Sequence, residues 1–203
     1  MVGSAAHHMG FRIAVGGGTA QGAETAARQL VADGALALAS IGLAGGLQPL
    51  LMPGKILIPR EIVLESGQRF PTDPELSRLL GGATAHSILG GARAVVKAWE
   101  KKQLWTLSGG AAVDLESGAV ARIAEEYGLP SAALRVICDP ATRNLPPAAL
   151  AALNPDGKVA FRSVLQALAT DPWQIPNLLS LANDAYHARR ALVRHLWSLQ
   201  PDR

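Results

Sequence analysis

Short apolar runs alternate with amphipathic, helix-like segments through most of the chain, and this alternation limits the fold more than any other feature. Residues 35–41 and 132–138 are almost uninterrupted apolar runs, which is typical of strands covered on both faces. Helical periodicity predicts helices at 20–33, 114–127 and 178–199. Strands that alternate with helices predict an α/β domain with a mixed, largely parallel central sheet flanked by helices.

Weaker patterns complete this secondary structure. Further strands are expected at 11–15, 56–59, 61–64, 86–89, 105–107 and 111–113, and further helices at 73–80, 92–101, 144–153 and 159–169. Residues 1–10 are interpreted as a flexible leader or cloning remnant, and residues 11–203 as one domain. The uncharged stretch 34–54 contains several glycines and two prolines. A strand followed by a glycine turn therefore explains it better than a membrane span.

Composition excludes several classes of protein. The chain of 203 residues is 49% hydrophobic and 17% charged, which excludes a disordered chain. A net charge of +3 is too small for a dedicated nucleic-acid binder, so no nucleic-acid partner is expected. The one cysteine, Cys138, excludes a disulfide framework, indicates a reducing, cytoplasmic compartment and is expected in the core. No cluster of residues has metal-ligand spacing, so we expect neither a metal nor a cofactor.

Two glycine clusters follow expected strands. Counting from Gly16 and Gly18, the third glycine of a dinucleotide-binding fingerprint would fall at Gln21, so that motif is incomplete. Glycines between a strand and a helix can still leave backbone N–H groups free for an anion. The cluster 42–46 lies after a buried strand, where ligands bind in open α/β sheets. An ordinary tight turn explains either cluster equally well.

Two carboxylates occupy positions that suit ligand binding or catalysis. Glu116 lies at the start of an expected helix, where the helix dipole favours the ionised form. Its two oxygens can accept hydrogen bonds from neighbouring hydroxyls such as a ribose diol, although a solvated first-turn Glu is the alternative. Asp139 closes the apolar run 132–138. Burial would favour its protonated form and let it protonate a leaving group, whereas capping the following turn is the alternative.

Three segments together resemble a known family. They are SIGLAGGL (40–47), VDLESGAVA (113–121) and LRVICD (134–139), and they are similar to signatures of the purine nucleoside phosphorylase and methylthioadenosine nucleosidase superfamily. The resemblance covers residues 11–140 in the right order. The segment DPATRNLPPAAL (139–150) and the Arg-rich final helix resemble the hopanoid-associated branch, whose members remove adenine from adenosylhopane in bacterial hopanoid synthesis.

The resemblance implies a set of roles. The chain would cleave the N-glycosidic bond of an adenine nucleoside with a bulky apolar 5′ substituent, by phosphorolysis slightly more than by hydrolysis, with inorganic phosphate as co-substrate. Asp139 would protonate or hydrogen-bond N7 of the purine, and Glu116 would bind the ribose hydroxyls. The other implied residues are Leu115, Gly45 and Gly46 at the sugar, and Gly17, Gly18 and Leu43 on the phosphate or water side. Members of the family are usually homo-oligomers.

Some features leave alternatives open. The family normally opens with a strand that ends in a site residue, and only ten residues precede Phe11, so this chain is expected to lack that first strand. The alternatives are a general purine nucleoside phosphorylase, a methylthioadenosine or S-adenosylhomocysteine nucleosidase, and a truncated relative that binds nucleosides without turnover. The helix 178–199 is interpreted either as a surface helix docked on the sheet or as a basic amphipathic helix that contacts the inner membrane surface.

Overall fold

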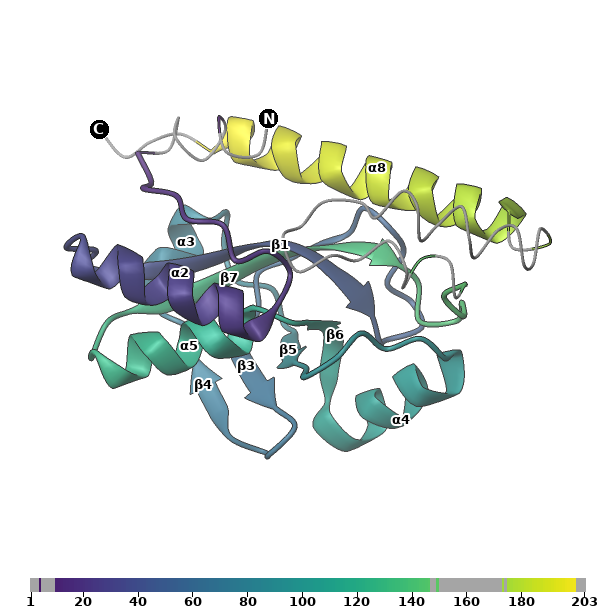
Figure 1. Cartoon of the computed structure of the whole chain (residues 1–203), viewed down its shortest axis with the longest axis horizontal. Coiled ribbons are helices and arrows are strands. Elements are labelled where there is room, and N and C mark those ends of the chain that lie inside the picture. Colours follow the sequence, from purple (N-terminus) through teal and green to yellow (C-terminus); the bar gives the residue numbers. More distant parts are fainter. Residues whose placement is uncertain (1–3, 5–9, 147–148, 150–172, 174, 200–203) are drawn as a thin grey trace.

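A computed structural model describes residues 4, 10–146, 149, 173 and 175–199. Within this part of the chain, seven strands form one mixed sheet in the order β2-β7-β1-β6-β5-β3-β4 (Figure 1). The strands are β1 (Leu38–Gly46), β2 (Ile56–Leu57), β3 (Glu61–Leu64), β4 (Arg69–Pro71), β5 (Ser87–Gly90), β6 (Gly110–Asp114) and β7 (Ser131–Asp139). The helices are α2 (Ala20–Ala32), α3 (Pro74–Leu79), α4 (Ala98–Ser108), α5 (Ser117–Glu126) and α8 (Ile175–Ser198).

The two longest strands, β1 and β7, lie side by side and parallel, so their carboxyl ends meet at one edge of the sheet. Their pairing shifts between Ala44 and Gly45, which places Gly45 opposite Asp139. On its other side β1 pairs with the antiparallel β6, with Gly45 opposite Val113. Because β6 runs back along β1, the residues that follow β6 approach the middle of β1.

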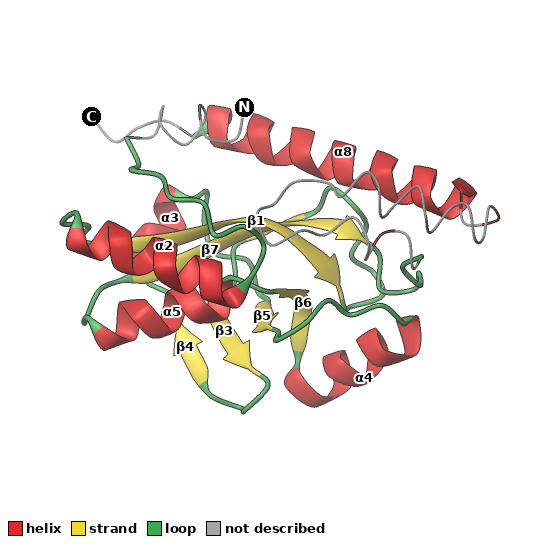
Figure 2. Ribbon diagram, in the orientation of Figure 1, coloured by secondary structure: helices red, strands yellow, loops and turns green. Residues whose placement is uncertain are grey.

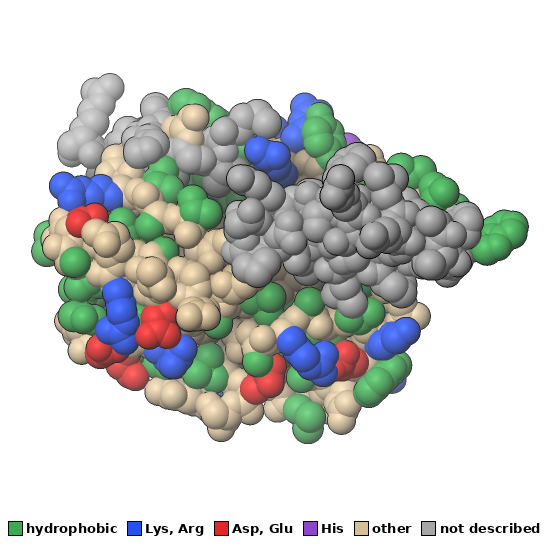
Figure 3. All heavy atoms as spheres, viewed as in Figure 1, with side chains coloured by type: hydrophobic (Ala, Val, Ile, Leu, Met, Phe, Trp, Pro, Cys, Tyr) green, Lys and Arg blue, Asp and Glu red, His purple; other side chains and the backbone are tan. Residues whose placement is uncertain are grey.

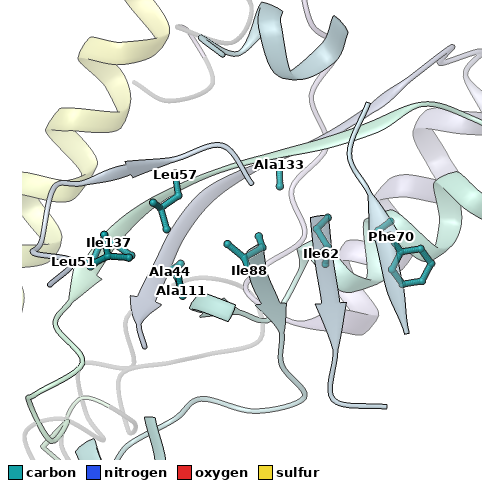
Figure 4. Packing of buried hydrophobic residues seen from close by; sticks show 11 residues of the cluster. Ala44, Leu51, Leu57, Ile62, Phe70, Ile88, Ala111, Ala133 and Ile137 are labelled. Carbon is teal, nitrogen blue, oxygen red and sulfur yellow. The ribbon is translucent and has the colours of Figure 1, made fainter. Parts of the chain in front are cut away.

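Helices cover both faces of this part of the sheet. The long helix α8 packs on one face of β7 and β1, whereas α5 packs on the other face (Figures 1 and 2). Helix α2 packs against α5. Alternate residues of β7 therefore pack into two different hydrophobic clusters, one on each face of the sheet. Leu134 and Val136 belong to the cluster with Leu192 of α8, and Ala133 and Ile137 belong to the cluster shown in Figure 4. By this alternation Arg135 lies on the α5 face.

The ends of α2 follow from local chemistry. Thr19 is the N-cap, and its hydroxyl oxygen accepts a hydrogen bond from the Gly22 N–H at 3.1 Å. Gly34 follows the helix with a φ of +86°, a left-handed conformation in which glycine meets no Cβ penalty. The expected helix 20–33 is therefore confirmed.

The α/β class with a mixed sheet flanked by helices is confirmed, but several local expectations are wrong. Residues 11–15 form no strand, and Phe11 packs instead into the core beneath α8. Residues 105–107 belong to α4, because Trp105 packs against the buried residues of the sheet on one helix face. The helix expected from 114 begins only at Ser117, and β4 was not expected.

One expected strand is displaced along the chain, and two expected helices lie largely outside the described residues. The strand expected at 35–41 is displaced to Leu38–Gly46. The expected helices 144–153 and 159–169 lie largely outside the described residues, and 144–146 are not helical. In the described part of the chain no helix is long and apolar enough to cross a membrane.

Candidate active site

The glycine loop before α2 holds the carboxylate of Glu116. The Gly18 N–H donates a hydrogen bond to Glu116 Oε1 at 2.9 Å. Gly17 and Gly18 have φ values of +70° and +75°, which only glycine adopts readily. A Cβ at Gly16 would lie 2.5 Å from Glu116 Oε1. The loop therefore needs glycine both for its backbone conformation and for its close approach to Glu116.

The middle of β1 brings Glu116 close to a buried cation. A Cβ at Gly42 would lie 2.8 Å from Arg135 Nη1 and 3.8 Å from Glu116 Oε2. The absence of a side chain at Gly42 thus leaves a space that both groups border. Arg135 is fully buried, and its Nε and Nη1 atoms have no hydrogen-bond partner among the described residues. Orphan donors of this kind are normally satisfied by a bound water or anion.

Arg135 is held by a buried network on the α5 side of the sheet. Its Nη2 donates to Ser40 Oγ at 2.5 Å and to Asp114 Oδ1 at 3.0 Å. Asp114 Oδ1 also accepts the N–H groups of Glu116 and Ser117, both at 2.7 Å. These bonds cap α5 and fix the backbone that carries Glu116.

Asp114 is ionised within this network. Burial disfavours the charged form, but the Arg135 guanidinium and the hydrogen bonds from Ser117 outweigh it and hold the pKa of Asp114 below its usual value. Because the pKa is lower in the folded protein, this carboxylate stabilises the fold above the usual Asp range and loses that effect as the pH falls through its folded-state value. The ionised pair Arg135–Asp114 is therefore intact at neutral pH.

Asp139 lies at the carboxyl end of β7 and is paired with a buried lysine. Asp139 Oδ2 accepts a hydrogen bond from Lys101 Nζ of α4. A Cβ at Gly45 would lie 3.1 Å from Asp139 Oδ1, and a Cβ at Gly46 would lie 3.1 Å from the Asp139 carbonyl oxygen. Gly45 therefore lets β1 approach this carboxylate closely, and Gly46 lets it approach the backbone of Asp139.

Both carboxylates thus lie beside glycines of the same strand, β1. Gly42 faces Glu116 and Arg135, whereas Gly45 faces Asp139. Three residues of strand correspond to about 10 Å, which is the scale of a nucleoside. The shifted pairing after Ala44 aligns Gly45 with Asp139 instead of Cys138.

The other residues expected in the site differ in position. Leu115 is half-buried between β6 and α5. Leu43 does not join the carboxylates, because its side chain packs in the cluster beneath α8, on the opposite face from Arg135. Cys138 packs in the same cluster, and burial raises the pKa of its thiol above its ordinary value. Cys138 is therefore an unreactive residue of the core.

Sequence reasoning did not assign roles to Arg135, Asp114 or Lys101. A lone Arg within the apolar run 132–138 was visible in the sequence, and a charge at a fully buried strand position is itself a signal of a site. Lys101 carried no such signal, since it lies in a segment rich in charged and polar residues. Among the described residues, no group of three or more His, Cys, Asp or Glu side chains is placed to hold a metal ion.

Comparison with known proteins identifies the family. A family model described as "Phosphorylase superfamily" matches residues 7–154. The chain belongs to the phosphorylase superfamily. This membership confirms the prediction of an enzyme of the nucleoside phosphorylase and nucleosidase class. No curated protein sequence matches the chain.

Solved structures share this superfamily fold. The 5′-methylthioadenosine/S-adenosylhomocysteine nucleosidase from Neisseria meningitidis, in complex with methylthio-immucillin-A, is 19% identical with a TM-score of 0.60, over 91% of this chain and 80% of that one. The S-adenosylhomocysteine nucleosidase from Streptococcus pyogenes is 17% identical with a TM-score of 0.61, over 91% and 77%. The futalosine hydrolase of Helicobacter pylori is 18% identical with a TM-score of 0.56, over 87% and 76%. At these identities the likeness shows the fold alone.

Proposed function

We propose that this superfamily member cleaves the N-glycosidic bond of an adenine nucleoside, with Glu116 at the ribose and Asp139 at N7 of the purine. The observation that carries the proposal is the arrangement along β1, where Gly42 borders Glu116 and Gly45 borders Asp139, and the two glycines lie about 10 Å apart along the strand. Family membership supports the reaction class. The similar nucleosidase structures, which hold nucleoside analogues, support a small-molecule nucleoside as substrate.

The two carboxylates would have different roles in the reaction. As the bond between C1′ and N9 breaks, the electron pair goes to the purine and positive charge develops on the sugar. Glu116 would accept hydrogen bonds from the ribose 2′- and 3′-hydroxyls, and its Oε2 has no hydrogen bond within the described residues. Asp139 would supply a proton to N7.

The group that attacks C1′ is either inorganic phosphate or water. The sequence resemblance favours inorganic phosphate. The charges of the described site residues favour water, because one guanidinium, Arg135, faces the two carboxylates of Asp114 and Glu116. A phosphate dianion would add negative charge to a site that already carries an excess of it. We therefore take water held near Arg135 as the attacking group, with phosphate as the alternative.

The substrate that we propose carries a bulky apolar 5′ substituent, as in adenosylhopane. The support is the resemblance of segment 139–150 and the final helix to the hopanoid-associated branch. A second candidate, a methylthioadenosine or S-adenosylhomocysteine nucleosidase, is favoured by the similar structures, which are nucleosidases of this kind. We further propose a cytoplasmic homo-oligomer, because members of the family usually assemble.

Adenine release by the purified protein tests these proposals. The substrates are adenosine, methylthioadenosine and an adenosine with a long 5′-alkyl chain, each with and without phosphate. Preference for the alkyl compound supports the hopanoid assignment, and preference for methylthioadenosine supports the second candidate. A requirement for phosphate would identify a phosphorylase. Nucleoside binding without any adenine release would instead indicate a non-catalytic relative.

Replacing Glu116 by Gln should distinguish substrates by their ribose hydroxyls. The variant keeps an acceptor for the Gly18 N–H but loses the charged acceptor for the diol, and hydrogen bonds to charged groups contribute about 1.5–3 kcal/mol. We expect kcat/KM for adenosine to fall by about tenfold to a hundredfold, and that for 2′,3′-dideoxyadenosine to change little. Equal losses on both substrates would contradict the ribose contact. Glu125→Gln, on the exposed side of α5, is the control.

The outer face of α8 has the composition of a membrane-surface helix. Leu179, Tyr186 and Trp197 are 66%, 57% and 51% exposed, and Arg189, Arg190 and Arg194 are exposed beside them. Each Lys or Arg near an anionic bilayer contributes about 1 kcal/mol. By contrast, Lys and Arg lie beside Asp and Glu on the lower part of the face in Figure 3. We therefore propose peripheral contact of α8 with anionic lipid.

Liposome co-sedimentation checks this contact. Binding should appear at low salt with anionic vesicles, be absent with neutral ones and fade as salt rises. Joint replacement of Arg189, Arg190 and Arg194 by Gln should abolish it. Retention that survives this triple replacement, or no retention on any vesicle, would leave α8 with a packing role only, through its buried residues Leu192 and Leu196.

A further inference from the structure

Lys101 is a fully buried lysine whose hydrogen-bonding capacity is completely used. It is 0% exposed, and its Nζ donates to Asp139 Oδ2, to the Pro140 carbonyl oxygen at 3.0 Å and to the Arg143 carbonyl oxygen at 3.1 Å. An ammonium group has three N–H donors and a neutral amine has two. Three acceptors and no donors around Nζ therefore require the charged form.

Asp139 is correspondingly held as a carboxylate. It is 5% exposed, its Oδ2 accepts from the Lys101 ammonium, and its Oδ1 accepts from Cys138 Sγ at 3.4 Å. All its described polar partners are donors, which favours the ionised form. A carboxyl group that protonates a leaving base by itself must start with a proton. Here the proton of the pair lies on the lysine.

Helix α4 and the segment after β7 form one unit around this ion pair. The Ala98 N–H donates to Asn144 Oδ1 at 2.8 Å, and the Leu145 N–H donates to the Val96 carbonyl oxygen at 2.8 Å. These contacts, together with the bonds from Lys101, join both ends of the segment 140–145 to α4. The position of Nζ relative to Asp139 is therefore set by the fold and not by a mobile side chain.

We propose that Lys101 is the positioning residue that stores the proton which Asp139 delivers to the purine; this inference rests on the proposed role of Asp139. As the bond between C1′ and N9 breaks, its electron pair passes to the purine. A proton moves from Lys101 Nζ to Asp139, and Asp139 gives a proton to N7. The lysine is then a neutral amine and Asp139 is again a carboxylate. The attacking water or hydrogen phosphate loses one proton to solvent, and solvent reprotonates Lys101.

The pH dependence of adenine release separates this role from a structural one. In Lys101→Met, Asp139 has no lysine proton to use and must itself be protonated. Its activity should fall by about 10²-fold at neutral and alkaline pH and recover in acid, so that the alkaline limb of the kcat profile moves to lower pH. Lys101→Arg keeps the charge but cannot give up a proton, so its activity should stay low without recovery in acid. Lys102→Met, an exposed neighbour on α4, is the matched control and should match the wild type.

A substrate whose leaving group needs no proton provides a second readout. On p-nitrophenyl riboside, which releases a stable phenolate, Lys101→Met should retain most of the wild-type kcat. Loss of activity that is uniform across pH and equal on both substrates would overturn the proposal, as would unchanged activity on adenosine. Restoration of adenine release by Lys101→Arg would also overturn it, because charge alone would then suffice.

Carbon-13 NMR of the Asp side-chain carboxyl groups tests the ion pair without catalysis, with Asp139→Asn to assign the signal. Asp139 should be ionised at neutral pH in the wild type and in Lys101→Arg. A protonated Asp139 in the wild type would overturn the proposal even if Lys101→Met fails to fold. Absence of adenine release by the folded wild type would overturn the proposed function and this inference with it. Adenine release with an unshifted alkaline limb in Lys101→Met would overturn the inference alone.

Discussion

Asn in place of Asp139 is expected to lower adenine release by a factor of about 10²–10⁴, the usual contribution of a general acid. An amide cannot pass a proton to N7, whichever group supplies that proton. The fold should survive, because the Asn Oδ1 atom can still accept a hydrogen bond from Lys101 Nζ, and the carbonyl oxygens of Pro140 and Arg143 still accept its other two N–H groups. Steady-state kinetics at saturating adenosine measure the loss.

The control for Asp139 is Asp33→Asn, which changes an exposed aspartate after α2. It should keep wild-type turnover, and both variants should give wild-type circular dichroism spectra. If Asp139→Asn retains more than about half of wild-type turnover, far short of the expected loss, the residue does not protonate the leaving base. A capping role for the segment after β7 would then be the remaining explanation.

The second large effect concerns stability. Met in place of Arg135 fills a similar volume but leaves the buried carboxylate of Asp114 without its cation. Breaking a buried ion pair by removal of one partner typically destabilises by about 3–5 kcal/mol. We expect a loss of this size in the free energy of unfolding, measured in urea at pH 7. The variant should also bind nucleosides poorly, because Asp114 caps the backbone that carries Glu116.

The pH dependence and a double variant check the cause of this loss. The Arg135 guanidinium helps to keep the pKa of Asp114 low, so the difference between wild type and Arg135→Met should shrink in acid, as Asp114 becomes protonated first in the folded variant and then in the folded wild type. Arg135→Met with Asp114→Asn removes both charges and should recover much of the stability. A loss that stays constant with pH, or that the double variant enlarges, would instead indicate a packing defect.

Arg122→Met is the matched control for this experiment. The Arg122 side chain is 50% exposed, and its nearest acidic oxygen, Glu24 Oε2, is 3.8 Å away. Exposed ion pairs of this kind contribute between 0 and about 1 kcal/mol. The control should therefore stay close to the wild type at every pH.

The candidate site was predictable from the sequence only in part. Glu116 and Asp139 could be found because each lies at the end of a regular element, where local pattern and family resemblance coincide. Lys101 could not be found, because 38 residues separate it from Asp139 and nothing in the helix α4 indicates which of its lysines is buried. Leu43 was assigned to the site from its position in a motif, but the alternation of strand β1 directs its side chain into the core beneath α8.

Periodicity and glycine placement by themselves determined the α/β class, the helices α2 and α5 in outline, and the long strand β7, since these features depend on local spacing and local steric limits. Only the tertiary structure decided the strand order, the antiparallel pairing of β6 with β1, and the shift after Ala44 that aligns Gly45 with Asp139. It also decided which charges are buried together, as in Arg135 with Asp114 and Lys101 with Asp139. Such pairs depend on distance in space between residues remote in sequence, and charges leave water only where the whole fold supplies their partners.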